Sequence, residues 1–72
     1  MTDSDFRVYA FVVDYFETNG YPPTIGEICV GLNTRSRGYV RERLERLDDA
    51  GYIKWDNRKH RAMKIVHDAQ GH

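Results

Sequence analysis

Two consecutive prolines, Pro22 and Pro23, restrict the fold of this 72-residue chain more than any other feature. Proline lacks a backbone amide hydrogen and disfavours helical conformation in the residue before it, so no regular helix runs through this point. Asn19 and Gly20 come shortly before the prolines, and glycine readily takes the left-handed conformation found after many helix ends. The chain on either side of the prolines is therefore expected to form separate elements joined by an extended segment.

The segment before the prolines, from about Ser4 to Thr18, is predicted to be an amphipathic helix. Ser4 or Asp3 can accept hydrogen bonds from the free amides at its start. Apolar residues recur at the three- and four-residue spacing that places side chains on one helix face, namely Val8, Phe11, Val12, Tyr15 and Phe16. This face is expected to pack against the rest of the domain.

After the prolines, Thr24 and Glu27 stand at the spacing of a capping box, in which each side chain accepts a hydrogen bond from the other residue's backbone amide. The pair predicts the start of a short helix, which Gly31 is expected to terminate. The apolar side of this helix comprises Ile25, Ile28, Cys29 and Leu32. Cys29 is interpreted as a small core residue rather than a nucleophile.

A third helix is predicted over residues 36–50, after a turn through residues 33–35. Ser36 is a favourable cap, and Gly51 follows the expected end of the helix. The positions i, i+4 and i+7 form an apolar stripe of Val40, Leu44 and Leu47. A short helix, a turn and a longer helix are typical of a helix-turn-helix, whose second helix enters the DNA major groove.

Residues 52–66 are predicted to form a β-hairpin with strands at Tyr52 to Trp55 and Ala62 to Val66. The turn between the strands, DNRKHR, is polar and basic. The predicted fold class is therefore mainly α with a small β-hairpin, a three-helix winged helix-turn-helix. Residues 1–66 are expected to form this one domain, and residues 67–72 are expected to form a disordered tail.

The 11 basic and 11 acidic residues balance, but they are segregated along the chain. Residues 1–33 carry one basic and five acidic residues, whereas residues 34–66 carry ten basic and five acidic residues. Charges scattered over solvated faces, the alternative interpretation, would not produce this division. A basic half is expected of a domain that turns one side toward the phosphates of a nucleic acid.

The first two turns of the third helix are expected to read bases, because only these turns normally reach base edges. With Val40 facing the core and about 100° per residue, Gly38 and Glu42 point outward while Tyr39 and Arg41 lie on the shoulders. Arginine can bond guanine at two acceptors, glutamate can accept from cytosine, and an aromatic ring can contact a thymine methyl. The candidates for base reading are Arg37, Gly38, Tyr39, Arg41 and Glu42. The alternative is an exposed helix with two i,i+4 ion pairs, Arg41 with Glu45 and Glu42 with Arg46.

The remaining positive side chains are interpreted as phosphate contacts, which set the register on DNA without reading its sequence. The predicted backbone contacts are Thr24, Thr34, Arg35, Lys54, Arg58, Lys59 and Arg61. Helix capping is the primary role expected of Thr24, with phosphate contact as a secondary one. For the hairpin tip the alternative is an ordinary polar turn.

The chain contains, in order, a predicted first helix that ends in DYFETNGYPPT, then the segments IGEICVGL and NTRSRGYVRERLERLDDAGYI, and then the basic hairpin. Together these segments cover residues 2–66 and resemble the amino-terminal DNA-binding domain of the LexA repressor family. The most specific part is NGYPPT leading into an Ile-x-Glu-Ile helix. The helix exit LxxLxxxGYI is shared by many winged-helix proteins.

The resemblance implies sequence-specific binding of double-stranded DNA by a transcriptional repressor or regulator, with helix 36–50 in the major groove and hairpin 52–66 on the backbone. It implies base-reading positions at Ser36, Gly38, Tyr39, Arg41 and Glu42. Only Ser36 and Glu42 have the family's residue type, so the family's operator sequence is not implied. LexA continues into a self-cleaving peptidase domain, and no self-cleavage is expected of these 72 residues.

Other classes of function find little support in the sequence. The single cysteine cannot form an internal disulfide, and the three histidines lack the spacing of a zinc site. Without a catalytic triad, phosphate loop or dinucleotide fingerprint, we expect no enzyme activity, cofactor or small-molecule substrate. The sequence has neither a signal-peptide pattern nor an apolar run that could span a membrane, so a cytoplasmic, nucleoid-associated location is expected.

Two further hypotheses concern partners. A winged-helix module that binds only proteins is the main alternative to DNA binding, because fold alone does not decide function. Structured RNA is less favoured, because A-form RNA lacks a wide major groove. The first helix also carries a second apolar edge, and we expect it to form a weak two-fold dimer interface on DNA through Phe6, Tyr9 and Val13. In the alternative arrangement, Tyr9 packs under the hairpin.

Overall fold

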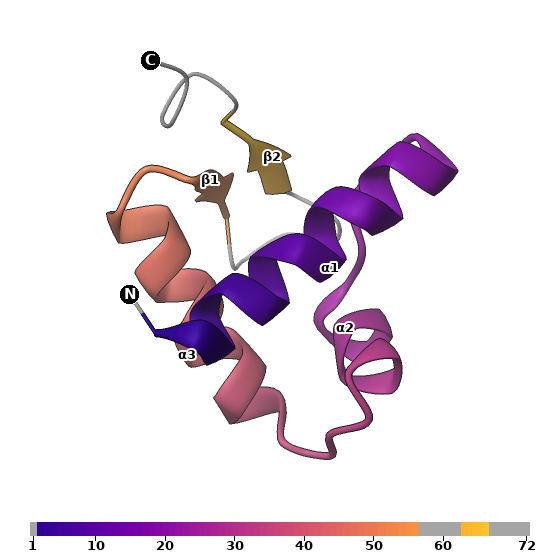
Figure 1. Cartoon of the computed structure of the whole chain (residues 1–72), viewed down its shortest axis with the longest axis vertical. Helices are drawn as coiled ribbons and strands as arrows, with labels where there is room; N and C mark the ends of the chain where they lie inside the picture. The colour runs from indigo at the N-terminus through magenta and orange to yellow at the C-terminus, as the bar shows by residue number, and fades with distance from the viewer. Residues whose placement is uncertain (1, 57–62, 67–72) are drawn as a thin grey trace.

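The computed structural model describes residues 2–56 and 63–66. Within these residues it contains three helices, α1 (Asp3–Asn19), α2 (Ile25–Gly31) and α3 (Arg37–Asp49), and an antiparallel hairpin of β1 (Ile53–Trp55) and β2 (Met63–Ile65) (Figure 1). The predicted class, a mainly α winged helix-turn-helix, is confirmed. None of the helices in the described ranges is long and apolar enough to cross a membrane.

Thr2 caps helix α1, so the prediction of Ser4 or Asp3 as the cap was wrong. The Asp5 amide donates to Thr2 Oγ1 at 3.3 Å, and the Thr2 amide donates to Asp5 Oδ2 at 3.0 Å. This reciprocal pair satisfies two amides, which favours a start at Thr2 over the later residues. At the other end Gly20 is left-handed (φ 82°) and donates to the Phe16 carbonyl at 2.7 Å, as predicted.

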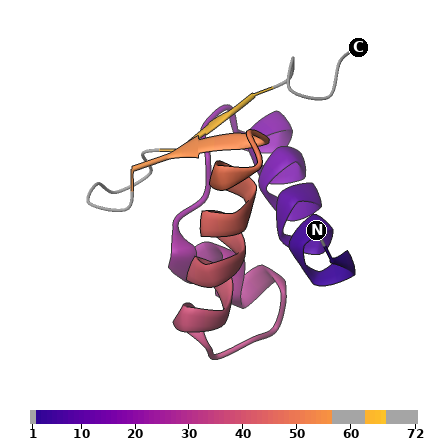
Figure 2. The same ribbon diagram turned by 90° about the vertical axis from the view of Figure 1, so that its left-hand side faces the viewer.

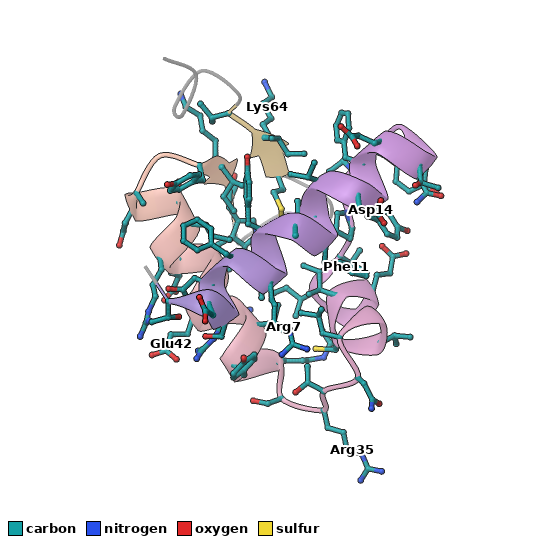
Figure 3. The ribbon with its side chains drawn as sticks, viewed as in Figure 1. Arg7, Phe11, Asp14, Arg35, Glu42 and Lys64 are labelled. Carbon is teal, nitrogen blue, oxygen red and sulfur yellow. The ribbon has the colours of Figure 1, made fainter. Side chains whose placement is uncertain are left out.

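Helix α2 begins with the predicted capping box. The Thr24 amide donates to Glu27 Oε1 at 2.8 Å, and the Glu27 amide donates to Thr24 Oγ1 at 3.1 Å. Helix α2 ends at Gly31, as predicted, but Gly31 does not have a positive φ, and it is Asn33 that takes the left-handed conformation (φ 57°). A Cβ atom on Gly31 would overlap the ring of Phe11, which lies between α1 and α2 (Figure 3). Glycine is therefore needed at the end of α2 for the close approach of two helices, and not for a left-handed conformation.

Helix α3 is the central element of the domain and packs against α1, α2 and β1. The Tyr39 amide donates to the Ser36 hydroxyl at 3.0 Å, which confirms Ser36 as the cap. The predicted apolar stripe is fully buried in the core. Figure 2 shows α3 in the middle of the molecule, with the hairpin at its carboxyl-terminal end. The core consists of Val8, Val12, Ile28, Cys29, Val40, Leu44, Leu47, Ile53 and Met63.

The hairpin strands are shorter than predicted, with three residues each in the described part of the chain. The register pairs Ile53 with Ile65, Lys54 with Lys64, and Trp55 with Met63. Ile53 and Met63 are buried, while Lys54 and Lys64 are exposed. Because residues directly opposite each other share a face, one face of the hairpin covers the core and the other presents two lysines side by side.

The second apolar edge of α1 packs within the same chain, against Tyr52 at the start of the hairpin. The Tyr9 and Tyr52 ring centres are 5.4 Å apart, and the Phe6 ring meets Tyr52 edge-on at 5.8 Å. Phe6 remains 42% exposed, whereas Tyr9 and Val13 are half-buried. Packing against Tyr52 thus accounts for much of the excess apolar surface that suggested a dimer interface.

Candidate nucleic-acid interface

One side of the first two turns of α3 faces away from the core. Arg37, Gly38, Arg41 and Glu42 are exposed, and so is Ser36, whose hydroxyl is engaged in capping. These positions surround the side of α3 opposite its fully buried stripe. The predicted base-reading residues are therefore brought together on one accessible surface, with the exception of Tyr39.

Tyr39 is half-buried and packs against the core. The guanidinium carbon of Arg43 lies 3.8 Å from the centre of its ring. Half-burial agrees with the expected position of Tyr39 on the shoulder of the helix, and its ring is packed on one side by protein. Only the remaining part of the ring can meet a ligand.

Arg41 connects α3 to the hairpin. Its guanidinium carbon lies 5.6 Å from the centre of the Trp55 ring, in the range of a cation–π interaction. This contact takes the place of the Arg41–Glu45 ion pair that the sequence offered as an alternative. Trp55 is half-buried and packs against the core, so the position of Arg41 depends on the hairpin.

The Glu42 carboxylate lies between two arginines. Its Oε1 is 2.8 Å from Arg43 Nη1, and its Oε2 is 3.8 Å from Arg46 Nη2, which is the predicted i,i+4 pair. The Glu42 side chain is nevertheless 59% exposed. It is therefore an accessible acceptor whose charge is offset by two neighbouring cations. Figure 3 shows Glu42 at the edge of the molecule.

Arg37 lies against the first turn of α2. A Cβ atom built on Gly26 would be 3.2 Å from Arg37 Nη2, tighter than an ordinary contact. Glycine at this position therefore leaves room for the guanidinium. The side chain is exposed and remains available to a ligand near the amino-terminal end of α3.

The predicted phosphate contacts are found at two places. Arg35 is exposed in the turn between α2 and α3 and points away from the body of the domain (Figure 3). Lys54 is exposed on β1, at the other end of α3. Thr34 and Thr24 have local partners, since Thr34 Oγ1 accepts from the Ser36 amide at 3.3 Å and Thr24 caps α2. Three predicted contacts, Arg58, Lys59 and Arg61, lie outside the described residues.

Sequence reasoning missed Lys64. It lies directly opposite Lys54 in the hairpin, and both side chains are exposed. Like charges placed opposite each other in a sheet repel, so this face of the hairpin favours a bound anion. The signal was present in the alternation of the second strand, because Met63 and Ile65 alternate with Lys64. Recognising that Lys64 lies opposite Lys54 requires the hairpin register, which the sequence alone does not supply.

An ion pair between a buried aspartate and a half-exposed arginine joins α1 to α3. Asp5 is fully buried in the first turn of α1, and its Oδ2 is 3.4 Å from Arg46 Nη1. Hydrogen bonding from the Thr2 backbone lowers the Asp5 pKa, burial opposes this, and Arg46 lowers it further. The ionised form therefore stabilises the fold at neutral pH, and this contribution is lost as the pH falls through the lowered pKa.

Comparison with known proteins gives a consistent result. The family described as LexA DNA binding domain matches residues 1–62. The chain is 40% identical over 68 residues to the LexA repressor of Syntrophobacter fumaroxidans and 35% identical over 66 residues to that of Carboxydothermus hydrogenoformans. Each alignment covers 92% of this chain and 32% of the relative. The LexA repressor of Staphylococcus aureus is 35% identical over 68 residues. The chain thus spans about a third of the length of these relatives.

Proposed function

Because the chain belongs to the LexA DNA-binding domain family, we propose that it binds double-stranded DNA sequence-specifically and acts as a transcriptional repressor. Helix α3 enters the major groove, and the hairpin lies on the flanking phosphate backbone. Such a protein works where the chromosome lies, so the proposed location is the cytoplasm, in association with the nucleoid.

One observation supports this function above the others: the two sides of α3 differ completely. Its inner side is a fully buried apolar stripe, while its outer side presents arginines and a glutamate within the first two turns. Such a helix is held rigidly by the core and offers hydrogen-bonding groups that suit base edges.

The proposed roles follow from the geometry. Arg37 and Arg41 can each donate two hydrogen bonds to guanine, and Glu42 can accept one from cytosine. Gly38 allows the helix backbone to approach the groove. Ser36, which is exposed at the start of the helix, and the uncovered part of the Tyr39 ring can also contact the bases.

The proposed phosphate contacts lie at both ends of α3. Arg35 contacts the backbone from the turn, and Lys54 and Lys64 contact it from the exposed face of the hairpin. Thr24 and Thr34 add polar contacts near the helix ends. Arg58, Lys59 and Arg61 are proposed to extend the hairpin contact, on the basis of the sequence.

Selection from a random duplex library tests the function. The protein is expected to enrich one short sequence, and its affinity for random duplex should fall steeply as the salt concentration rises. Salt-independent binding, or no enrichment, would favour the protein-interaction alternative. The enriched sequence would also supply the operator, which the family resemblance does not.

We also propose that two copies pair weakly on adjacent half-sites through Phe6, Tyr9 and Val13. The contacts with Tyr52 reduce the apolar area available, and Phe6 retains the largest exposed fraction of the three. Sedimentation with a duplex of two half-sites measures the stoichiometry. Loss of cooperative binding in the Phe6→Ser variant supports the interface. Unchanged cooperativity in the double variant Phe6→Ser, Val13→Ser excludes this interface.

A further inference from the structure

Arg43 of α3 is a largely buried arginine to which the sequence analysis assigned no role. Its side chain is 15% exposed, and its guanidinium stacks on the Tyr39 ring with 3.8 Å between guanidinium carbon and ring centre. Nη1 donates to Glu42 Oε1 at 2.8 Å, and Nε donates to Ser4 Oγ at 3.3 Å. One guanidinium therefore joins the start of α1 to two of the proposed base-reading residues.

A guanidinium is the cationic group best suited to these three contacts. It is planar, so it can stack on a ring, and its donors point in fixed directions within that plane. A lysine ammonium retains the charge but cannot stack flat on Tyr39 while holding two oxygens at separate positions. The Ser4 hydroxyl lies in the first turn of α1, which the Thr2 capping box holds in place. Arg43 is thus joined to the capped first turn of another helix.

The contact of Arg43 with Glu42 also offsets the negative charge of the Glu42 carboxylate. A carboxylate that faces DNA is repelled by the phosphates, and this repulsion weakens binding to every sequence. Arg43 on one oxygen and Arg46 on the other offset this charge, and Arg46 is itself paired with the buried Asp5. Glu42 can therefore present an acceptor to a base while adding little net negative charge at the interface.

We propose that Arg43 is a positioning residue that determines sequence specificity without contacting DNA. It holds the Tyr39 ring and the Glu42 carboxylate in the arrangement that reads bases. Through its contact with Ser4, it also makes the orientation of these two side chains depend on the position of α1. This inference rests on the proposed function, because specificity is defined only for a protein that binds DNA.

Arg43→Lys is the direct test, since it preserves the charge and removes the planar contacts. The ratio of affinities for the selected site and for random duplex is expected to fall about five- to tenfold, at the lower end of the effect of losing a base contact. Affinity for random duplex and its salt dependence should not change. Arg35→Lys is the matched control, because Arg35 is exposed in the turn and its conservative replacement should leave the ratio unchanged.

A double-mutant cycle of Arg43→Lys with Glu42→Gln measures whether the two residues act together, and Glu45→Gln is the exposed control on the same helix. If Arg43 acts through Glu42, the double variant of these two residues should lose less specificity ratio than the product of the two single losses. With Glu45→Gln, the loss in the double variant should equal that product. If Arg43→Lys does not fold, Ser4→Ala removes the hydroxyl that accepts from Arg43 Nε, together with its 2.9 Å contact with Thr2 Oγ1, and should lower the ratio in the same direction, by a smaller factor. An unchanged ratio in the folded variants overturns the inference.

The geometry can also be tested without DNA. Nuclear Overhauser contacts between the Arg43 side chain and the Tyr39 ring are expected in the free protein, and their absence overturns the inference while leaving the proposed function intact. A wild-type protein that selects no sequence instead rejects the proposed function itself. The two failures are therefore distinguishable.

Discussion

The helices before residue 33 and the helix after it differ in their polar contacts: α1 and α2 begin with local capping pairs, whereas α3 has a local cap at Ser36 and long-range contacts with α1 as well. In α1 and α2 the capping hydrogen bonds join residues three positions apart. In α3 the contacts of Arg43 with Ser4 and of Arg46 with Asp5 span 39 and 41 residues. Local contacts thus decide where the first helices begin, and long-range contacts decide how the side chains of α3 are oriented.

This difference assigns a role to the acidic half of the chain. It contributes Ser4, which accepts a hydrogen bond from Arg43, and Asp5, which pairs with Arg46. The first helix is therefore more than a cover for the core, because it also orients the surface that we propose binds DNA. The following predictions test whether the two regions are as interdependent as these contacts indicate.

The largest effect is expected from Leu44→Ala. Leu44 is fully buried in the central helix, and removing a buried leucine typically costs about 2–5 kcal/mol of the free energy of unfolding. Urea denaturation followed by circular dichroism and by resolved amide signals of both regions measures this cost. One shared transition is expected, and separate transitions of α1 and the hairpin would show that the two regions are independent units.

Arg41→Ala should weaken binding to the selected DNA site by about 1–3 kcal/mol and affect random duplex much less. The reason is that Arg41 is exposed at the start of α3 and is held by Trp55. Arg35→Ala is the contrasting variant, expected to reduce both affinities alike. Equal losses for Arg41→Ala on both DNAs would reject its base-reading role.

Gly31→Ala should destabilise the domain by about 1 kcal/mol, because overpacking against Phe11 exceeds the gain in helix propensity. Gly38→Ala is the matched control. Its added methyl group would meet only Ser36 Oγ, at an ordinary contact distance of 4.0 Å, so this variant should gain about 0.5–1 kcal/mol. Chemical denaturation of both variants gives the comparison. A stabilised Gly31→Ala would show that the α1–α2 contact adapts easily.

The smallest effect on folding is expected from Lys64→Ala. Removing one of two opposed lysines should stabilise the hairpin by about 0.2–1 kcal/mol. The same variant should bind all duplexes more weakly, and its slope of log affinity against log salt should become shallower by about one. Thermal unfolding and salt titrations measure the two effects. A lower stability together with an unchanged slope would remove Lys64 from the proposed interface.

Much of the fold was predictable because its signals are local. The Thr24–Glu27 capping box, the Ser36 cap and the stripe of Val40, Leu44 and Leu47 each depend on spacing within one helix. The cap of α1 was misassigned because several candidates adjoin one another, and spacing to a reciprocal acid at Asp5 decides among them.

The parts that were not predictable depend on tertiary contacts. Gly31 has the residue type of a helix terminator, but its role comes from the Phe11 ring on another helix. The candidate base-reading residues could be placed on the right helix, yet the partners of Tyr39 and Arg41 could not be named. Helical periodicity gives the direction of a side chain from the axis and contains no information about the element that meets it there.

Trp55 has a practical consequence because it is the only tryptophan of the chain. It lies where α3 meets the hairpin, beneath the guanidinium of Arg41. Tryptophan emission responds to nearby charge and hydration, and any ligand that draws Arg41 away changes both. The protein therefore contains an intrinsic fluorescent probe at the junction of its two proposed DNA-contacting elements. Association and dissociation rates can be followed there with unlabelled protein and unlabelled DNA.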